Sequence, residues 1–192
     1  KGVIWYQGES NAHNMDAHEQ LFRLLVDSWR SNWKNPEMPF YFVQLSSLNR
    51  PSWTWFRDSQ LRLMKSIPNT GMAVSSDQGD SLDVHPTHKQ PVGERLGRWA
   101  LNQTYGHAVT PSGPIYNNVV KKGDNLVVSF TYGDGLRTSD GKSPSCFEIA
   151  EEDGLFYPAQ VKIEGSKVRV SSPEVKAPRY VRYAWQPFTR AN

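Results

Sequence analysis

Two short stretches of the sequence carry residue types that could catalyse hydrolysis. The first is residues 7–11, with the letters QGESN, and the second is residues 83–86, DVHP. Asp83 stands two residues before His85, so its carboxylate can accept the ring N–H and stabilise the imidazolium that forms when the other ring nitrogen takes a proton. This is the pairing of orienting acid and general base in a hydrolase triad, although the same spacing is common in solvated surface turns.

The polar segment 7–11 has three interpretations. Residues 8–12, GESNA, resemble a degenerate G-x-S-x-G nucleophile elbow, in which Ser10 would attack; the order of serine, aspartate and histidine along the chain fits that class. Alternatively, Gln7 and Asn11 are amide donors directed at a developing oxyanion, with Glu9 as a polar support. In the third interpretation the serine and asparagine only cap the helix that follows. The spacing does not choose between nucleophile and oxyanion donor.

Both stretches follow apolar runs that predict strands. Strands are expected at 3–6, 40–45 and 71–75, and helical patterns at 15–34, 53–67 and 89–105. Regular alternation of strand and helix predicts a parallel sheet, and ligands in open α/β sheets usually bind at the carboxyl ends of the strands. The two stretches are therefore expected at one edge of an α/β domain. In the first helix, one face is expected to carry Leu21, Leu24, Leu25, Ser28 and Trp29.

The composition changes at residues 109–114, VTPSGP. Short apolar runs separated by glycine-containing turns follow, which predicts an antiparallel sheet or a small sandwich. We therefore expect an α/β domain at 1–109 and a β-rich accessory domain at 110–192. The second domain ends without an obvious stop signal, which is compatible with truncation.

The composition excludes several classes of protein. The 22 basic and 19 acidic residues give a net charge of +3 and are scattered, whereas nucleic-acid binding would favour a basic stripe. No apolar run approaches the about 20 residues of a membrane-spanning helix. Cys146 is the single cysteine, so an internal disulfide is excluded. The chain opens on a predicted strand without Met, so we expect that its first residue is not a natural start, and the lack of a signal peptide does not argue against secretion.

Neither a metal nor a cofactor is expected. His88 follows His85 by three residues, but no third ligand of suitable spacing accompanies the pair. Trp53 and Trp55, beside the polar loop 46–51, could stack on a sugar. Arg57 and Gln60, three residues apart on a predicted helix, could face the same cleft or form an ordinary exposed pair. The substrate-binding candidates are Glu9, Asn11, Trp53, Arg57 and Gln60.

Several motifs together resemble one family. Residues 5–11 (WYQGESN), 57–60 (RDSQ), 83–86 (DVHP), 89–90 (KQ) and 95–96 (RL) closely resemble the sialate O-acetylesterase family of SGNH-type carbohydrate esterases. Residues 112–116 (SGPIY), 147–150 (FEIA) and 181–185 (VRYAW) are similar to that family's C-terminal β region. The resemblance implies an SGNH-hydrolase-like, flavodoxin-like three-layer fold, a secreted or periplasmic location, and hydrolysis of acetyl esters on sialic acid or a related glycan.

The resemblance also assigns roles. In that family the nucleophilic serine lies in a G-Q-S-N type motif upstream of W-Y-Q-G-E. No such motif is present here, and the resemblance therefore argues against Ser10 as the nucleophile. The chain would then be the C-terminal portion of a longer esterase, or one piece of a cleaved one, with the missing N-terminal part as partner. Gln7 would help form the oxyanion hole, His85 would be the base and Asp83 its orienter. The alternatives are a non-catalytic glycan-binding fragment and an acetylxylan-type esterase with the same chemistry.

Overall fold

A parallel sheet forms the centre of the N-terminal part in this computed structural model, which describes residues 1–192. Its strands are β1 (Val3–Trp5), β2 (Phe40–Val43) and β3 (Thr70–Ala73), in the order β1-β2-β3. Both pairings are parallel. All four residues of β2 are buried, as expected for a central strand that is covered on both faces.

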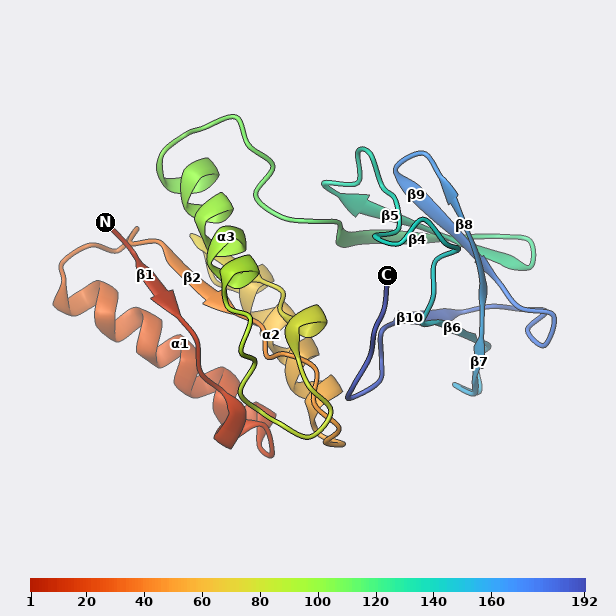
Figure 1. Cartoon of the computed structure of the whole chain (residues 1–192), viewed down its shortest axis with the longest axis horizontal. Helices are drawn as coiled ribbons and strands as arrows, with labels where there is room; N and C mark the ends of the chain where they lie inside the picture. Colours follow the sequence, from red (N-terminus) through yellow and green to blue (C-terminus); the bar gives the residue numbers. More distant parts are fainter. The chain divides into compact units, whose positions relative to one another are not determined.

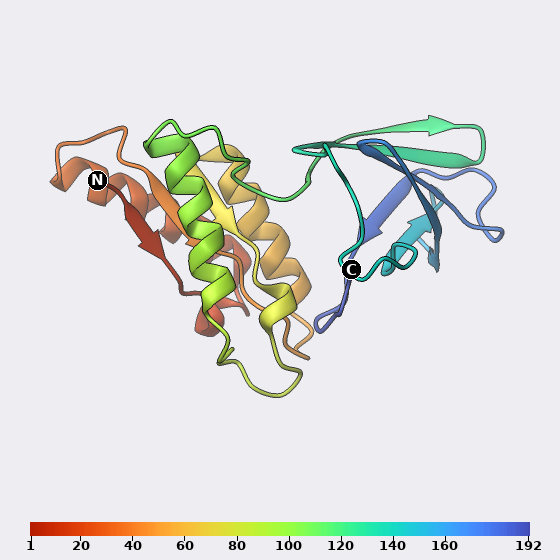
Figure 2. The same cartoon turned by 45° about the horizontal axis from the view of Figure 1, so that its top comes forward.

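Three helices cover this sheet. They are α1 (Met15–Asn32), α2 (Trp53–Ser66) and α3 (Gln90–Trp99), and a π-helical turn, Ala100–Thr104, extends α3. On one face, Phe22 of α1 and Leu63 of α2 share a core with Phe40 and Phe42. On the other face, Trp99 of α3 stacks on Tyr41 with ring centroids 6.4 Å apart. The result is a three-layer α/β/α unit, with α3 on the opposite side of the sheet from α1 and α2 (Figures 1 and 2).

The buried face of α1 differs from the one expected from the sequence. The buried residues are His18, Phe22, Val26 and Arg30. Leu21 and Leu24 are 59% and 63% exposed, so their prediction as part of the buried face was wrong. The reason is that two polar residues belong to the true stripe: His18 packs 4.4 Å from the ring of Phe56, and Arg30 donates hydrogen bonds to main-chain carbonyls.

The C-terminal part is made of antiparallel strands. They are β4 (Ile115–Lys122), β5 (Asn125–Thr131), β6 (Phe147–Ala150), β7 (Phe156–Pro158), β8 (Gln160–Glu164), β9 (Lys167–Ser171) and β10 (Tyr180–Tyr183). They form one sheet of order β4-β5-β9-β8 and another of order β10-β6-β7. Their shared core includes Val128, Ile149 and Val170. The predicted fold class, a parallel α/β part followed by antiparallel strands, is confirmed.

The chain divides into two compact units, one of which is discontinuous in sequence. The first contains Lys1–Ser112 and the segment Gln186–Phe188, and the second contains Gly113–Trp185 and Thr189–Asn192. None of the helices combines the length and the hydropathy that a membrane crossing requires.

Candidate active site

Three loops leave the carboxyl ends of the parallel strands. The loop after β1 carries Gln7, Glu9 and Asn11, and the loop after β3 carries Asp83 and His85. The loop after β2, residues 44–52, lies between them in the sheet order. Because all three strands run in the same direction, these loops share one edge of the sheet, which is the edge where open α/β sheets bind ligands.

Asp83 and His85 are in direct contact. Oδ1 of Asp83 accepts the backbone N–H of His85 at 2.9 Å and lies 3.1 Å from its ring Nδ1. The backbone and ring hydrogen bonds from His85 hold the pKa of Asp83 below its usual value, so the carboxylate stays ionised. Since a carboxylate only accepts, this contact favours the tautomer with the proton on Nδ1, which leaves Nε2 able to take another.

The ends of the loop that carries this pair are held by further polar contacts. Asp80 Oδ1 accepts the backbone N–H groups of Leu82 and Asp83 at 2.8 and 3.1 Å. At the start of the loop, Asp77 forms a bidentate ion pair with Arg95 of α3, at 2.6 and 2.7 Å. Burial raises the pKa of Asp77, but the hydrogen bonds from Arg95 and Gln78 lower it by more, so the net shift is downward. The loop is therefore tied to α3.

The turn after β1 depends on Gly8. Its φ is 148°, and a Cβ at this position would lie 2.7 Å from Cε1 of Phe56, so both the backbone angle and the space require glycine. A short 3-10 helix, Glu9–Asn11, follows. The cap of α1 is Asn14, which accepts the N–H of Ala17 at 3.1 Å. The interpretation in which Ser10 and Asn11 cap the next helix is therefore wrong.

The structure does not join Ser10 to the histidine. Ser10 is exposed, and no hydrogen bond links it to His85. Gln7, Glu9 and Asn11 are partly exposed. They are therefore accessible at the carboxyl end of β1, and their roles as oxyanion donor and substrate contacts stay predictions.

Sequence reasoning missed Tyr6, the residue directly after β1. Burial raises the pKa of its phenol, while hydrogen bonds with Ser75 and Ser46 oppose the shift. The ammonium of Lys89 lies 4.7 Å from the centre of its ring. Tyr6 thus connects the ends of all three strands. Its place directly before the Q-G-E letters was the only signal in the sequence.

Trp53 and Gln60 of α2 are buried and hold the loop after β2. The indole N–H of Trp53, which is 1% exposed, donates to the carbonyl of Ser46 at 2.6 Å. The amide of Gln60 accepts from Leu45 N–H at 2.8 Å and donates to Val43 O at 3.1 Å. Their contact with substrate stays a prediction, but these bonds already give both side chains a role in shaping the loop.

Arg57 lies on the same helix and is also buried. Its guanidinium donates to Ser47 Oγ at 3.2 Å and to the carbonyl of Gln186 at 2.5 Å. Trp55, two residues earlier, is 56% exposed and presents its ring to the surface. The exposed ring of Trp55 therefore offers a face for stacking on a sugar.

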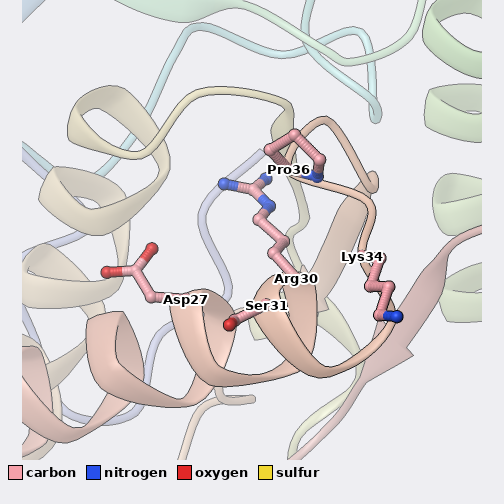
Figure 3. A pocket seen from close by; sticks show the side chains of 5 residues that line it. All are labelled: Asp27, Arg30, Ser31, Lys34 and Pro36. Atoms are coloured by element: carbon pink, nitrogen blue, oxygen red, sulfur yellow. The ribbon is translucent and has the colours of Figure 1, made fainter.

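A shallow hollow of about 400 Å³ lies away from these loops (Figure 3). It is lined by Asp27, Arg30, Ser31, Lys34 and Pro36, at the end of α1. Because α1 runs from the carboxyl end of β1 back to the amino end of β2, the hollow lies at the opposite edge of the sheet from His85. No group of three or more His, Cys, Asp or Glu side chains is arranged to hold a metal ion.

Residues 1–104 match the family of carbohydrate esterases described as sialic acid-specific acetylesterases, and the chain belongs to this family. The resemblance seen in the sequence is thereby confirmed. The chain is 30% identical to the sialate O-acetylesterase of Rattus norvegicus, over 96% of this chain and 39% of the relative. It is 31% identical to the human sialate O-acetylesterase, over 78% of this chain and 33% of the relative.

A solved structure is similar to the whole chain. It is a carbohydrate acetylesterase from Xanthomonas citri, with a TM-score of 0.91 and 35% identity, over 97% of this chain and 45% of that protein. The chain thus spans less than half the length of each of these relatives.

Proposed function

We propose that this chain supplies the general base and an oxyanion donor of a carbohydrate O-acetylesterase that acts on acetylated sialic acid or a related glycan. The observation that carries the proposal is the contact of Asp83 with His85, 3.1 Å long, in the loop after the last parallel strand. The contact has the chemistry of an orienting acid and its base. It lies at the carboxyl edge of the sheet, where open α/β sheets usually bind ligands.

The proposed reaction passes through an acyl-enzyme. Nε2 of His85 takes the proton of an attacking serine while that oxygen bonds to the acetyl carbonyl carbon, and Gln7 donates to the resulting oxyanion. The imidazolium, stabilised by Asp83, then gives the proton to the sugar oxygen as the ester bond breaks. Water then attacks the acetyl-serine while His85 takes a proton from it, and His85 returns that proton to the serine oxygen as the bond to the acetyl group breaks and acetate leaves.

We infer that the attacking serine lies outside these residues. Ser10 makes no hydrogen bond with His85, and the relatives extend well beyond the matched region. The sheet order leaves β1 at an edge, and Ile4 on this strand is 70% exposed. A further parallel strand paired there would bring its carboxyl end beside Gln7. The missing N-terminal part of the same esterase would supply this strand.

The assignment to acetylated sugars rests on the similarity to relatives that are sialate and carbohydrate acetylesterases. An acetylxylan-type substrate would require the same chemistry. A glycan-binding fragment without catalysis is the second candidate, and the exposed ring of Trp55 is the observation in its favour.

An esterase assay with two proteins tests the proposal. The chain alone and a longer protein that contains the relatives' N-terminal part are incubated with an aryl acetate and with an O-acetylated sialic acid. We expect hydrolysis by the longer protein only, and labelling by a fluorophosphonate at a serine outside these residues. Hydrolysis by the chain alone that Ser10→Ala abolishes would restore the elbow interpretation. Sugar binding by the longer protein without hydrolysis would support the second candidate.

A further inference from the structure

A three-residue segment from the far end of the chain belongs to the unit that carries the candidate site. Gln186–Phe188 lies outside residues 1–104, which match the family, but it is part of the first compact unit. Hydrogen bonds attach it there. Leu48 N–H donates to Pro187 O at 3.2 Å, and Arg57 Nη2 donates to Gln186 O at 2.5 Å.

Arg57 connects this segment with the loop after β2. Its Nη1 donates to Ser47 Oγ at 3.2 Å, and its own carbonyl accepts the side-chain amide of Gln44 at 2.9 Å. Burial lowers the pKa of Arg57 to about 10. A guanidinium is costly to bury, so this position needs several well-placed hydrogen-bond acceptors to be stable.

The loop after β2 in turn contacts the loop that carries Asp83 and His85. Ser75 Oγ donates to Gln44 O at 2.6 Å, and Asn49 N–H donates to Ser81 O at 3.1 Å. Between these bonds, Gly79 lies so close to Ser47 that a Cβ would be 2.1 Å from the Ser47 carbonyl oxygen. Only glycine fits there. Hydrogen bonds and close packing therefore run from Arg57 to a residue two positions before Asp83.

We propose that Arg57 is a positioning residue that clamps the segment Gln186–Phe188 to the loop after β2 and so fixes the loop that bears Asp83 and His85. The clamp itself does not depend on the proposed function. Only its effect on turnover rests on that function. The C-terminal segment is then a working part of the esterase unit.

Amide hydrogen exchange of the 192-residue chain tests the clamp directly. In Arg57→Gln, we expect the amides of Leu48 and Asn49 to exchange about tenfold faster or more, because hydrogen bonds to a charged group are lost. The amide of Phe42 in β2 should not change. Arg57→Lys should recover part of the protection, since an ammonium cannot donate in the fork geometry of a guanidinium. Unchanged exchange in Arg57→Gln would overturn the clamp.

Two further variants serve as a control and as a replacement if Arg57→Gln does not fold. Arg62→Gln is the matched control, because Arg62 lies on the same helix but binds the surface carboxylates of Glu19 and Asp58; it should leave the amides of Leu48 and Asn49 unchanged. If Arg57→Gln does not fold, Ser47→Ala removes one acceptor of the guanidinium with little change in volume. It should speed the exchange of Asn49, and no change there would contradict the clamp.

Kinetics of the longer esterase then separate positioning from substrate binding. With an aryl acetate, Arg57→Lys should lower kcat about tenfold and leave KM within about twofold, because the base is misplaced while the pocket persists. A raised KM with unchanged kcat and unchanged exchange would instead make Arg57 a substrate-binding residue. Fast exchange with unchanged kcat would show a clamp that does not act on His85, which overturns the positioning role. An inactive wild-type protein would contradict the proposed function while the exchange result still judges the clamp.

Discussion

A single oxygen of Asp83 serves two donors of His85. Oδ1 accepts the backbone N–H at 2.9 Å and lies 3.1 Å from the ring Nδ1. The same atom therefore closes the turn and orients the imidazole. These two tasks can be separated, because only the second benefits from the negative charge.

Asp83→Asn should keep the turn and lose the charge. An asparagine oxygen can still accept the backbone N–H of His85, but it stabilises the imidazolium far less. We expect kcat of the longer esterase to fall by about tenfold or more, with little change in Tm, and Asp83→Ala to lose order in the loop as well. Steady-state kinetics and NMR of the His85 amide measure both effects. Equal kcat in wild type and Asp83→Asn would remove the carboxylate from the mechanism.

Gln7→Ala should reduce turnover without unfolding the protein. Loss of one oxyanion donor typically costs about a hundredfold to a thousandfold in kcat. Because Gln7 is only partly buried, the thermal unfolding midpoint should stay near that of the wild type. Gln20→Ala, at an exposed position of α1, is the control and should alter neither quantity. Near-normal turnover in Gln7→Ala would rule out the oxyanion role.

His18 should make the fold sensitive to mild acid. Burial lowers the pKa of this histidine below its usual 6.5, and the nearby Glu19 opposes the shift only in part. The folded state therefore keeps the ring neutral where the unfolded chain already takes up a proton. The contribution of neutral His18 to the free energy of unfolding is therefore complete above pH 6.5. As the pH falls below 6.5, the free energy of unfolding decreases by at most about 1.4 kcal/mol per pH unit.

Urea unfolding between pH 7.5 and pH 5 checks this dependence. His18→Gln should flatten the change in free energy of unfolding with pH, whatever its effect at neutral pH. His13→Gln, at an exposed position, should keep the wild-type slope. The same slope in His18→Gln and wild type would assign the acid sensitivity to another group.

Asp77 should contribute stability at a lower pH. Its pKa lies below the usual value because the hydrogen bonds from Arg95 and Gln78 outweigh the effect of burial. A carboxyl group whose pKa is lowered by folding stabilises the folded state at pH values above its pKa in the unfolded chain, which is about 4. This stabilisation is lost as the pH falls through the lower pKa of the folded state. Asp77→Asn should therefore weaken the fall in Tm below pH 4. Calorimetry in which Asp77→Asn and wild type lose Tm in parallel would contradict this contribution.

Local patterns in the sequence were enough for the parallel part of the fold. The run at 40–45, apolar except for Gln44, contains β2, and the apolar letters of β2 are those of a strand covered on both faces. The buried face of α1 was missed because it includes His18 and Arg30. These polar residues interrupt the apolar pattern by which a buried helix face is recognised. Strand β7 gives a weak signal in the sequence because it is three residues long and ends in Pro158. Proline lacks the backbone N–H, but it is tolerated here since β7 is an edge strand.

In the candidate site, contacts between near neighbours in the sequence could be predicted, and contacts between distant residues could not. The contact of Asp83 with His85 spans two positions, so spacing alone could predict it. The bond from Arg57 to Gln186 spans 129 positions, and no local pattern signals it. The constraint on Gly79 has the same origin, because it arises from the approach of another loop. Sequence spacing could not predict the hydrogen bonds and the close packing between these loops.

We propose His85 as the general base of an esterase whose attacking serine lies outside these residues. The most direct test of this proposal is the kcat of the longer esterase with an aryl acetate, measured for His85→Ala and for the control His13→Ala. We expect His85→Ala to lower kcat by about a hundredfold to ten-thousandfold and His13→Ala to leave it unchanged. Turnover of His85→Ala close to that of the wild type would contradict it.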